Sequence, residues 1–243
     1  MILKETVKKI IFRKKSSSKS YVKYLKKLGM KIGDGTIIYD PIHTMIDLTR
    51  PWLIEIGENV KITYDVIILT HGFEWSVIKT KYNDVLGSAG KVKIGNNVFV
   101  GMRTTILKGV TIGDNVIIGA NSLINKDIPS NVVVAGNPAK IVCSIEEYYE
   151  KRMEKQVYEA VELATEYYNV YNKWPNREVL REFLFWFDER TDKINNDIIF
   201  NEISSINGNY DETLSQFFNR KREFSSYHDF INYCKKKMKE GKK

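Results

Sequence analysis

Histidine is the side chain in this sequence best suited to proton transfer near neutral pH, because an imidazole can both accept and return a proton there. The chain has three histidines: His43, His71 and His228. His71 follows Thr70 and stands where a regular repeat of the sequence is interrupted. A histidine acting as a base needs a carboxylate to orient it. Asp47 is the first candidate and Glu74 the second.

A repeat with a period of six residues must position these side chains. Residues 112–116 (IGDNV) repeat residues 94–98 (IGNNV) after 18 positions. Aliphatic residues recur in register at Ile94, Val100, Ile106, Ile112, Ile118 and Ile124. A second set follows each by four positions: Val98, Thr104, Val110, Val116, Ser122 and Ile128. Such a period predicts a parallel β-helix whose coils have three flat faces and stack at strand spacing.

The same repeat locates its interruptions. A further copy begins at Ile56, which is 38 residues before Ile94, so about one loop of 20 residues is inserted into that coil. The register holds through Ile68, which places the loop at about residues 71–91. A fainter copy begins at Ile32, 24 residues before Ile56, and predicts a smaller bulge near residues 47–52. Long loops on a rigid scaffold commonly carry function.

Helical patterns flank the repeats and predict three segments. Residues 1–29 have helical spacing (Leu3, Val7, Ile10 and Ile11, then Val22, Leu25 and Leu28) and end at Gly29, a plausible C-cap. Residues 30–143 hold the β-helix. Residues 144–243 form a helical extension that opens with a capping box, Ser144 and Glu147, on a helix to about Asn169. Further expectations are a helix from Pro175, a turn at residues 207–209 and a last helix capped by Ser225 or Ser226.

Composition limits the class of protein. The net charge of +8 is concentrated at the ends, since residues 1–29 and 235–243 together carry +14 and the rest −6. We interpret these ends as a solvated surface, with weak peripheral attraction to an anionic membrane as the alternative; no nucleic-acid motif accompanies the lysines. The sequence lacks an apolar run near the ~18 residues of a membrane span and a signal-peptide core. Its two cysteines lack metal-type spacing, which favours a reducing, cytoplasmic location.

The last repeats carry a family resemblance. Residues 112–142 contain KDIP at 126–129 and GNPA at 136–139, and resemble the closing coils of the left-handed β-helix (hexapeptide-repeat) acyltransferases. That superfamily includes maltose, galactoside and streptogramin acetyltransferases and polysaccharide O-acetyltransferases. The resemblance covers about residues 30–143. It implies a mainly β fold, a left-handed parallel β-helix, between the N-terminal helical segment and the α-helical C-terminal extension.

The resemblance also implies a chemistry. His71, in its Thr-His context, matches the general base for transfer of an acetyl group from acetyl-CoA. No nucleophile motif adjoins it, so direct transfer without an acyl-enzyme is expected. Acetyl-CoA would lie in a cleft between two subunits of a homotrimer. Matching coenzyme-binding positions are Gly101, Met102, Gly119, Ala120, Asn125, Lys126, Gly136 and Lys140. Met102 replaces the usual small residue, and Lys140 replaces an arginine, keeping the charge without the bidentate fork.

The acceptor stays open between several alternatives. The first is a hydroxyl of a sugar or surface-polysaccharide precursor. The others are the amine of an amino (nucleotide) sugar and a streptogramin-type antibiotic. A hexapeptide-repeat scaffold without catalysis is the non-enzyme alternative, and His71 argues against it. A zinc carbonic anhydrase of this fold needs three histidines around its metal, and one of the three here lies in the helical extension. No metal is therefore expected.

Overall fold

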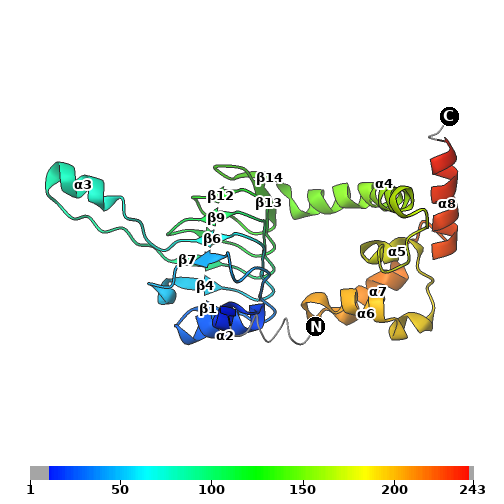
Figure 1. Ribbon diagram of the computed structural model, residues 1–243, viewed down its shortest axis with the longest axis horizontal. Coiled ribbons are helices and arrows are strands. Elements are labelled where there is room, and N and C mark those ends of the chain that lie inside the picture. Colours follow the sequence, from blue (N-terminus) through cyan, green and yellow to red (C-terminus); the bar gives the residue numbers. More distant parts are fainter. Residues whose placement is uncertain (1–10, 241–243) are drawn as a thin grey trace. The chain divides into compact units, whose positions relative to one another are not determined.

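The computed structural model describes residues 11–240, and the chain divides into two compact units at Tyr149 and Glu150 (Figure 1). The first unit is a left-handed parallel β-helix with three faces, as predicted. One face holds β1 (Lys31–Ile32), β4 (Ile54–Ile56), β7 (Val92–Ile94) and β10 (Thr111–Ile112). The second holds β2 (Ile37–Ile38), β5 (Lys61–Ile62), β8 (Phe99–Val100), β11 (Ile117–Ile118), β13 (Val132–Ala135) and β14 (Lys140–Ser144). The third holds β3 (Met45–Ile46), β6 (Ile67–Ile68), β9 (Thr105–Ile106) and β12 (Leu123–Ile124).

The repeat positions fill the core as predicted. Both in-register sets are buried, and Ile128 is the most exposed of them at 8%. Strands pair in parallel and in register, Ile62 with Val100 and Val100 with Ile118 on the second face. The departure is β14, which folds back antiparallel on β13, so the parallel repeat ends in a hairpin of residues 132–144.

Asparagines turn the chain at one edge of each coil. Asn97, Asn115 and Asn131 adopt positive φ angles of 54° to 62°, a conformation that asparagine tolerates better than most residues. Their side-chain amides stack, with Asn97 Nδ2 donating to Asn115 Oδ1 and Asn115 Nδ2 to Asn131 Oδ1, both at 2.9 Å. The recurring Asn in the sequence therefore serves the turns.

The 20-residue insertion lies between β6 and β7, where the register predicts it. Residues 69–91 form an arm that contains one helix, α3 (Trp75–Tyr82), near its tip (Figure 1). The six extra residues of the first coil are divided. Ile38 and Ile46 pair with Ile62 and Ile68, so two extra residues lie between β2 and β3. The other four lie in the bulge of residues 47–53 before β4, which includes the 3-10 helix η2 (Pro51–Leu53). The prediction of a single bulge was wrong in this respect.

The N-terminal helical segment covers the first coil. After η1 (Arg13–Lys15), helix α2 (Ser18–Lys27) begins at the Ser17 cap and buries Tyr21 and Leu25. Gly29 follows it with a φ of +106°, the conformation that favours glycine after a helix. The predicted helical positions Leu3, Val7 and Ile10 lie outside the described residues.

The second unit is helical. The capping box forms as predicted, since the Ser144 and Glu147 side chains each accept from the other residue's amide at 3.1 Å at the start of α4 (Ile145–Tyr171). Then come η3 (Arg181–Phe183), α5 (Leu184–Phe187), η4 (Asp192–Asn196), α6 (Ile198–Ser204), η5 (Ile206–Gly208), α7 (Tyr210–Asn219) and α8 (Tyr227–Glu240). Ser226 caps α8 by accepting from the Asp229 amide at 3.1 Å.

The prediction of a helix from Pro175 was wrong. The segment forms turns, η3 and the four-residue α5 instead. Phe185, Trp186 and Phe187 follow one another, so the apolar side chains do not keep to one helical face. The segment buries Trp186 and Phe187 by turning within the core of the second unit. Among the described residues, no helix has the length and apolar character needed to cross a membrane.

Candidate functional site

A histidine–carboxylate pair stands at the base of the arm. The His71 Nδ1 atom lies 2.6 Å from Asp47 Oδ2. Asp47 follows β3 and His71 follows β6 by three residues, and the register of Ile46 with Ile68 brings both to the same edge of neighbouring coils. The structure thus places Asp47 against His71, which are 24 positions apart in the sequence.

The Asp47 carboxylate is buried and fully occupied. Its Oδ1 accepts from the Thr49 amide at 2.9 Å and from Thr49 Oγ1 at 2.7 Å. Its Oδ2 accepts from the Thr70 amide, from Thr70 Oγ1 and from His71. Burial by itself would raise the pKa of the carboxyl, but the hydrogen bonds from Thr70, Thr49 and His71 outweigh it and hold the pKa of Asp47 well below its usual range.

This arrangement selects one form of the imidazole. Because Asp47 is ionised, it can only accept, so the Nδ1 atom of neutral His71 must carry the proton. The lone pair is then on Nε2, and the side chain is 35% exposed. A carboxylate that fixes the tautomer of a half-exposed imidazole is the arrangement of a general base with its orienting partner.

Backbone hydrogen bonds hold the two strands of the arm together next to the His71–Asp47 pair. The Gly72 amide donates to the Ser88 carbonyl at 3.2 Å and the Gly90 amide to the Thr70 carbonyl at 2.9 Å, and these bonds flank an antiparallel bridge between His71 and Ala89. Gly90 also passes close to the next coil, because a Cβ on it would lie 2.6 Å from the Gly109 amide nitrogen. The backbone of His71 is therefore held on two sides.

Glu74 does not orient His71. Its carboxylate pairs with the Lys108 ammonium at 2.8 Å, on the next coil. Hydrogen bonds from Lys108 and Ser88 lower the pKa of Glu74 to about 2. The contact ties the arm to the β-helix instead. Asp47 has one partner that the sequence did not single out, Thr49, although a threonine two positions after an aspartate is a turn signal. Thr70 was noted only as the residue before His71, and its contact with Asp47 was not predicted.

Comparison with known proteins agrees with this fold. A family model described as bacterial transferase hexapeptide (six repeats) matches residues 91–126. Protein CapG of Staphylococcus aureus is 40% identical over 135 residues, which cover 55% of this chain and 77% of that protein. The chain belongs to the hexapeptide-repeat acetyltransferase superfamily.

Two further relatives of this superfamily match over shorter parts. The galactoside O-acetyltransferase of Escherichia coli (strain K12) is 38% identical over 41% of this chain, which spans about half (48%) of that relative. A crystal structure of a hexapeptide-repeat acetyltransferase from Vibrio cholerae, complexed with acetyl coenzyme A, is 29% identical. It covers 48% of this chain and 60% of that chain, with a TM-score of 0.41.

The coenzyme-binding positions expected of an acetyltransferase in this superfamily fall on two different edges of the β-helix. One set follows strands of the third face, as His71 does, and we name this edge the His71 corner; it includes Asn125 and Lys126. The other set follows strands of the second face, and we name this edge the Met102 corner. It includes Gly101, Met102, Gly119, Ala120, Gly136 and, across the final hairpin, Lys140.

The Met102 corner presents an open surface. Met102 is 48% exposed, and Ala120 of the next coil is exposed as well. Gly101 is buried beneath them, and a Cβ on it would lie 2.6 Å from the Ala120 amide nitrogen, so the coils approach too closely for any side chain there. Within one chain, this surface and His71 lie at different edges of the coils.

A second histidine–carboxylate pair lies at the Met102 corner. His43 Nδ1 lies 2.6 Å from Asp40 Oδ2. Asp65 completes a group whose ligand atoms lie within 4.8 Å of one another, a spacing that could hold a metal ion. Arg103 Nε is 3.7 Å from Asp65, however, so one of the two acids already has a cationic partner.

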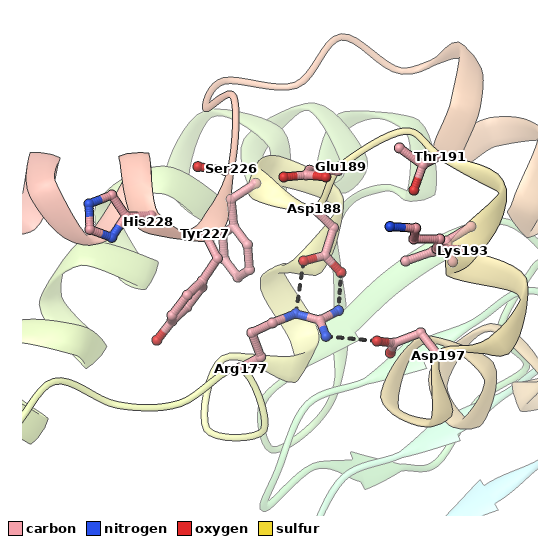
Figure 2. Close-up of a pocket in the computed structure, with 11 residues that line it drawn as sticks. Arg177, Asp188, Glu189, Thr191, Lys193, Asp197, Ser226, Tyr227 and His228 are labelled. Atoms are coloured by element: carbon pink, nitrogen blue, oxygen red, sulfur yellow. Dashed lines mark hydrogen bonds and ion pairs between the residues drawn. The ribbon is translucent and has the colours of Figure 1, made fainter.

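The helical unit contains a separate pocket of about 470 Å³ (Figure 2). Arg177 joins two acids there, with Nη2 paired to Asp188 and Nη1 2.7 Å from Asp197. Burial raises the pKa of Asp188 although Arg177 opposes it, and the two carboxylates raise the pKa of Arg177 against the effect of its burial. His228 lines the pocket from α8. Arg177, Asp188 and Asp197 are paired with one another. We therefore interpret these charges as a structural ion-pair network and not as a binding site.

Proposed function

We propose that this protein is an acetyl-CoA-dependent O-acetyltransferase whose general base is His71. The observation that carries the proposal is the contact between His71 Nδ1 and the ionised Asp47, which leaves Nε2 as a proton acceptor at the base of the arm. Acetyl-CoA supplies the activated acetyl group as a thioester. Transfer from it to an alcohol needs such a base, because the hydroxyl must lose its proton as it attacks.

The chain's own residues support a direct mechanism. His71 Nε2 takes the hydroxyl proton while the acceptor oxygen forms a bond to the carbonyl carbon of the thioester. Asp47 stabilises the imidazolium that forms and keeps it in place. When the carbon–sulfur bond breaks, His71 returns its proton to the leaving thiolate. Atoms and charge balance without an acyl-enzyme, and the site needs no metal in this scheme.

A sugar is the acceptor class that we propose. The Escherichia coli relative is a galactoside O-acetyltransferase, which supports a sugar hydroxyl or a polysaccharide precursor as the acceptor here. Amino sugars and streptogramin-type antibiotics are the alternatives, and a screen with all three classes distinguishes them. Transfer to an amine only would replace the O-acetyl assignment by an N-acetyl one.

We propose a homotrimer as the active form. The expected coenzyme-binding positions lie at two corners of one chain, with His71 at one and Met102 at the other. A closed ring of identical copies can place the His71 corner of one copy against the Met102 corner of the next. Such a cleft would unite both sets of residues around one acetyl-CoA.

The substitution His71→Ala tests the proposal. It should leave the β-helix folded, because His71 occupies no core position of the repeat. The value of kcat should fall by about 10²–10⁴-fold, the usual contribution of a general base, with little change in acetyl-CoA affinity. The measurements are transfer rate, thermal stability and the stabilisation that acetyl-CoA gives. His228→Ala, in the other unit, is the matched control and should behave as the unmodified protein.

Near-normal transfer by the His71→Ala protein would show that the general base lies elsewhere. A protein that millimolar acetyl-CoA does not stabilise would argue against the acetyl donor itself. The rate of the unmodified protein should also fall on acidification, because a protonated imidazole cannot accept the proton of the acceptor.

A further inference from the structure

Helix α2, which packs on the first coil at one end of the β-helix, carries four lysines on one side (Figure 1). They are Lys19, Lys23, Lys26 and Lys27. Residues that follow the first by four, seven and eight positions lie on the same side of a helix. The opposite side buries Tyr21 and Leu25 in the core. All four lysine side chains are exposed, and we name them the α2 lysine face.

The α2 lysine face has little counter-charge. Lys26 pairs with Asp34 at 3.3 Å. In the part of the chain that the structure describes, Lys19, Lys23 and Lys27 make no ion pair or hydrogen bond. Helix α2 has no acidic residue. Lysines three or four positions apart repel one another and weaken a helix, so helix stability does not account for this spacing.

The two lysines that precede α2 differ from this face, because they bind the protein itself. Lys15 donates to the carbonyls of Ile42 at 3.1 Å and Thr44 at 3.2 Å, and its burial lowers its pKa. The Lys14 ammonium lies 3.9 Å from the centre of the Tyr24 ring. Both contacts attach the N-terminal segment to the rest of the unit. The unpaired lysines of α2 have no such structural role, so their charge is available to a partner.

A groove adjoins the α2 lysine face and adds an apolar surface to it. It lies between α2 and residues 33–37, has a volume of about 900 Å³, and is lined by Val22 and Ile37 as well as by the four lysines. Two large apolar residues before α2 are also exposed, Ile11 at 64% and Phe12 at 39%. Cations beside exposed apolar side chains fit a membrane surface, where phosphates lie above acyl chains. A soluble polyanion would satisfy only the charges.

We propose that the α2 lysine face docks on an anionic lipid surface. The ammonium groups contact lipid phosphates, and Ile11 and Phe12 enter the boundary between headgroups and acyl chains. Lysine suits such a surface, because a point charge on a flexible stem needs no fixed geometry in its partner. Each lysine brought to an anionic membrane strengthens binding by about fivefold. The proposal does not depend on the transferase function, because docking needs no turnover.

Binding of the full chain to lipid vesicles tests the proposal. One set of vesicles contains phosphatidylcholine alone, and the other contains about 30% phosphatidylglycerol to supply the negative charge. At low salt, the protein should bind the anionic vesicles about 100-fold more tightly than the neutral ones. The difference should shrink as salt screens the charges. Sedimentation of the protein with the vesicles measures both.

The triple variant Lys19→Gln, Lys23→Gln and Lys27→Gln should bind the anionic vesicles about 100-fold more weakly, at about fivefold for each lysine. Its thermal stability should be unchanged or higher, because the change removes repulsion within α2. Arginine at the same three positions should keep the binding, because it keeps the charge. A variant that loses stability together with binding would assign these lysines a structural role and overturn the proposal.

The matched control removes three exposed lysines from helix α8. The variant Lys235→Gln, Lys236→Gln and Lys239→Gln loses the same charge and should bind vesicles as the unmodified protein does. An equal loss of binding in this control would show that net charge alone attracts the protein, and would overturn the proposal. Equal binding to neutral and anionic vesicles would do the same. Binding to RNA or to an acidic polysaccharide without binding to vesicles would replace the lipid by a soluble polyanion.

Discussion

At the scale of single residues, the site depends on how many donors one carboxylate accepts. Asp47 takes hydrogen bonds from two threonines and His71, which together fix its ionised state. The same saturation fixes the tautomer of His71. One buried acid therefore determines which nitrogen of the neighbouring imidazole can accept a proton.

Asp47→Asn should show this coupling. An amide can offer only one acceptor oxygen, so its NH₂ group must face donors from a threonine. We expect a loss of about 1–3 kcal/mol of stability. We also expect a fall of about 10²–10⁴-fold in kcat, because the wrong tautomer of His71 becomes accessible. Unfolding and transfer assays on the same sample provide both measurements.

The stability difference should depend on pH in one direction. The pKa of Asp47 is lower in the folded protein than its usual value near 4, so its contribution is present above that value. It is lost as the pH falls through the lower, folded-state pKa. The unmodified protein and Asp47→Asn should therefore converge in stability in strong acid. A difference that grows on acidification would contradict the pKa direction.

At the scale of elements, the base of the arm holds the backbone of His71, the candidate base. Its base holds His71 through the bridge to Ala89, and Gly90 packs against the Gly109 backbone. The Lys108–Glu74 pair adds a further attachment. We therefore expect a displacement at this end of the arm to move the imidazole of His71.

Gly90→Ala should move the base of the arm, because the new Cβ would lie 2.6 Å from a backbone nitrogen that cannot rotate away. We expect kcat to fall by about 10- to 100-fold, the cost of a misplaced catalytic group. Gly87→Ala, on the same arm, meets no atom within 4 Å and serves as the matched control. Equal rates for the two variants would show that the arm does not position His71.

At the scale of the whole molecule, the β-helix separates the two halves of the proposed site. His71 and the Met102 corner lie on different edges of each coil, so in the proposed trimer each copy supplies one half of a cleft. Assembly would then be a condition for activity. The helical unit has its own aromatic core and its own ion pairs, so we treat it as a separate body.

Mixed trimers test the shared cleft. His71→Ala lacks the base, and Ala120→Trp would fill the exposed Met102 corner. Each should be inactive alone. Co-expressed, they should regain about a quarter of the activity, because random assembly pairs an intact corner of each kind at that frequency. Sedimentation must show trimers in every sample. Active monomers, or mixed trimers without activity, would contradict a site between copies.

The sequence by itself determined the β-helical coil, its inward-facing positions and the places where it is interrupted. Each inward position is an isoleucine, valine or small residue at a period of six, and each interruption is a change in that period. Because this information is local and repeated, the buried set from Ile94 to Ile124 and the insertion after Ile68 could be derived without a structure. The capping box at Ser144 is local in the same way and formed as predicted.

The side-chain contacts at the edges of the β-helix were evident only from the tertiary structure. Two contacts depend on side chains that are distant in the sequence: Asp47 with His71, and Glu74 with Lys108. The first coil has six extra residues, and the structure divides them between two turns. The spacing along the chain gives the number of extra residues but not the turn in which each lies. The broken helix after Pro175 has a similar cause, since consecutive aromatic residues gained more from burial in the core than from one continuous helix.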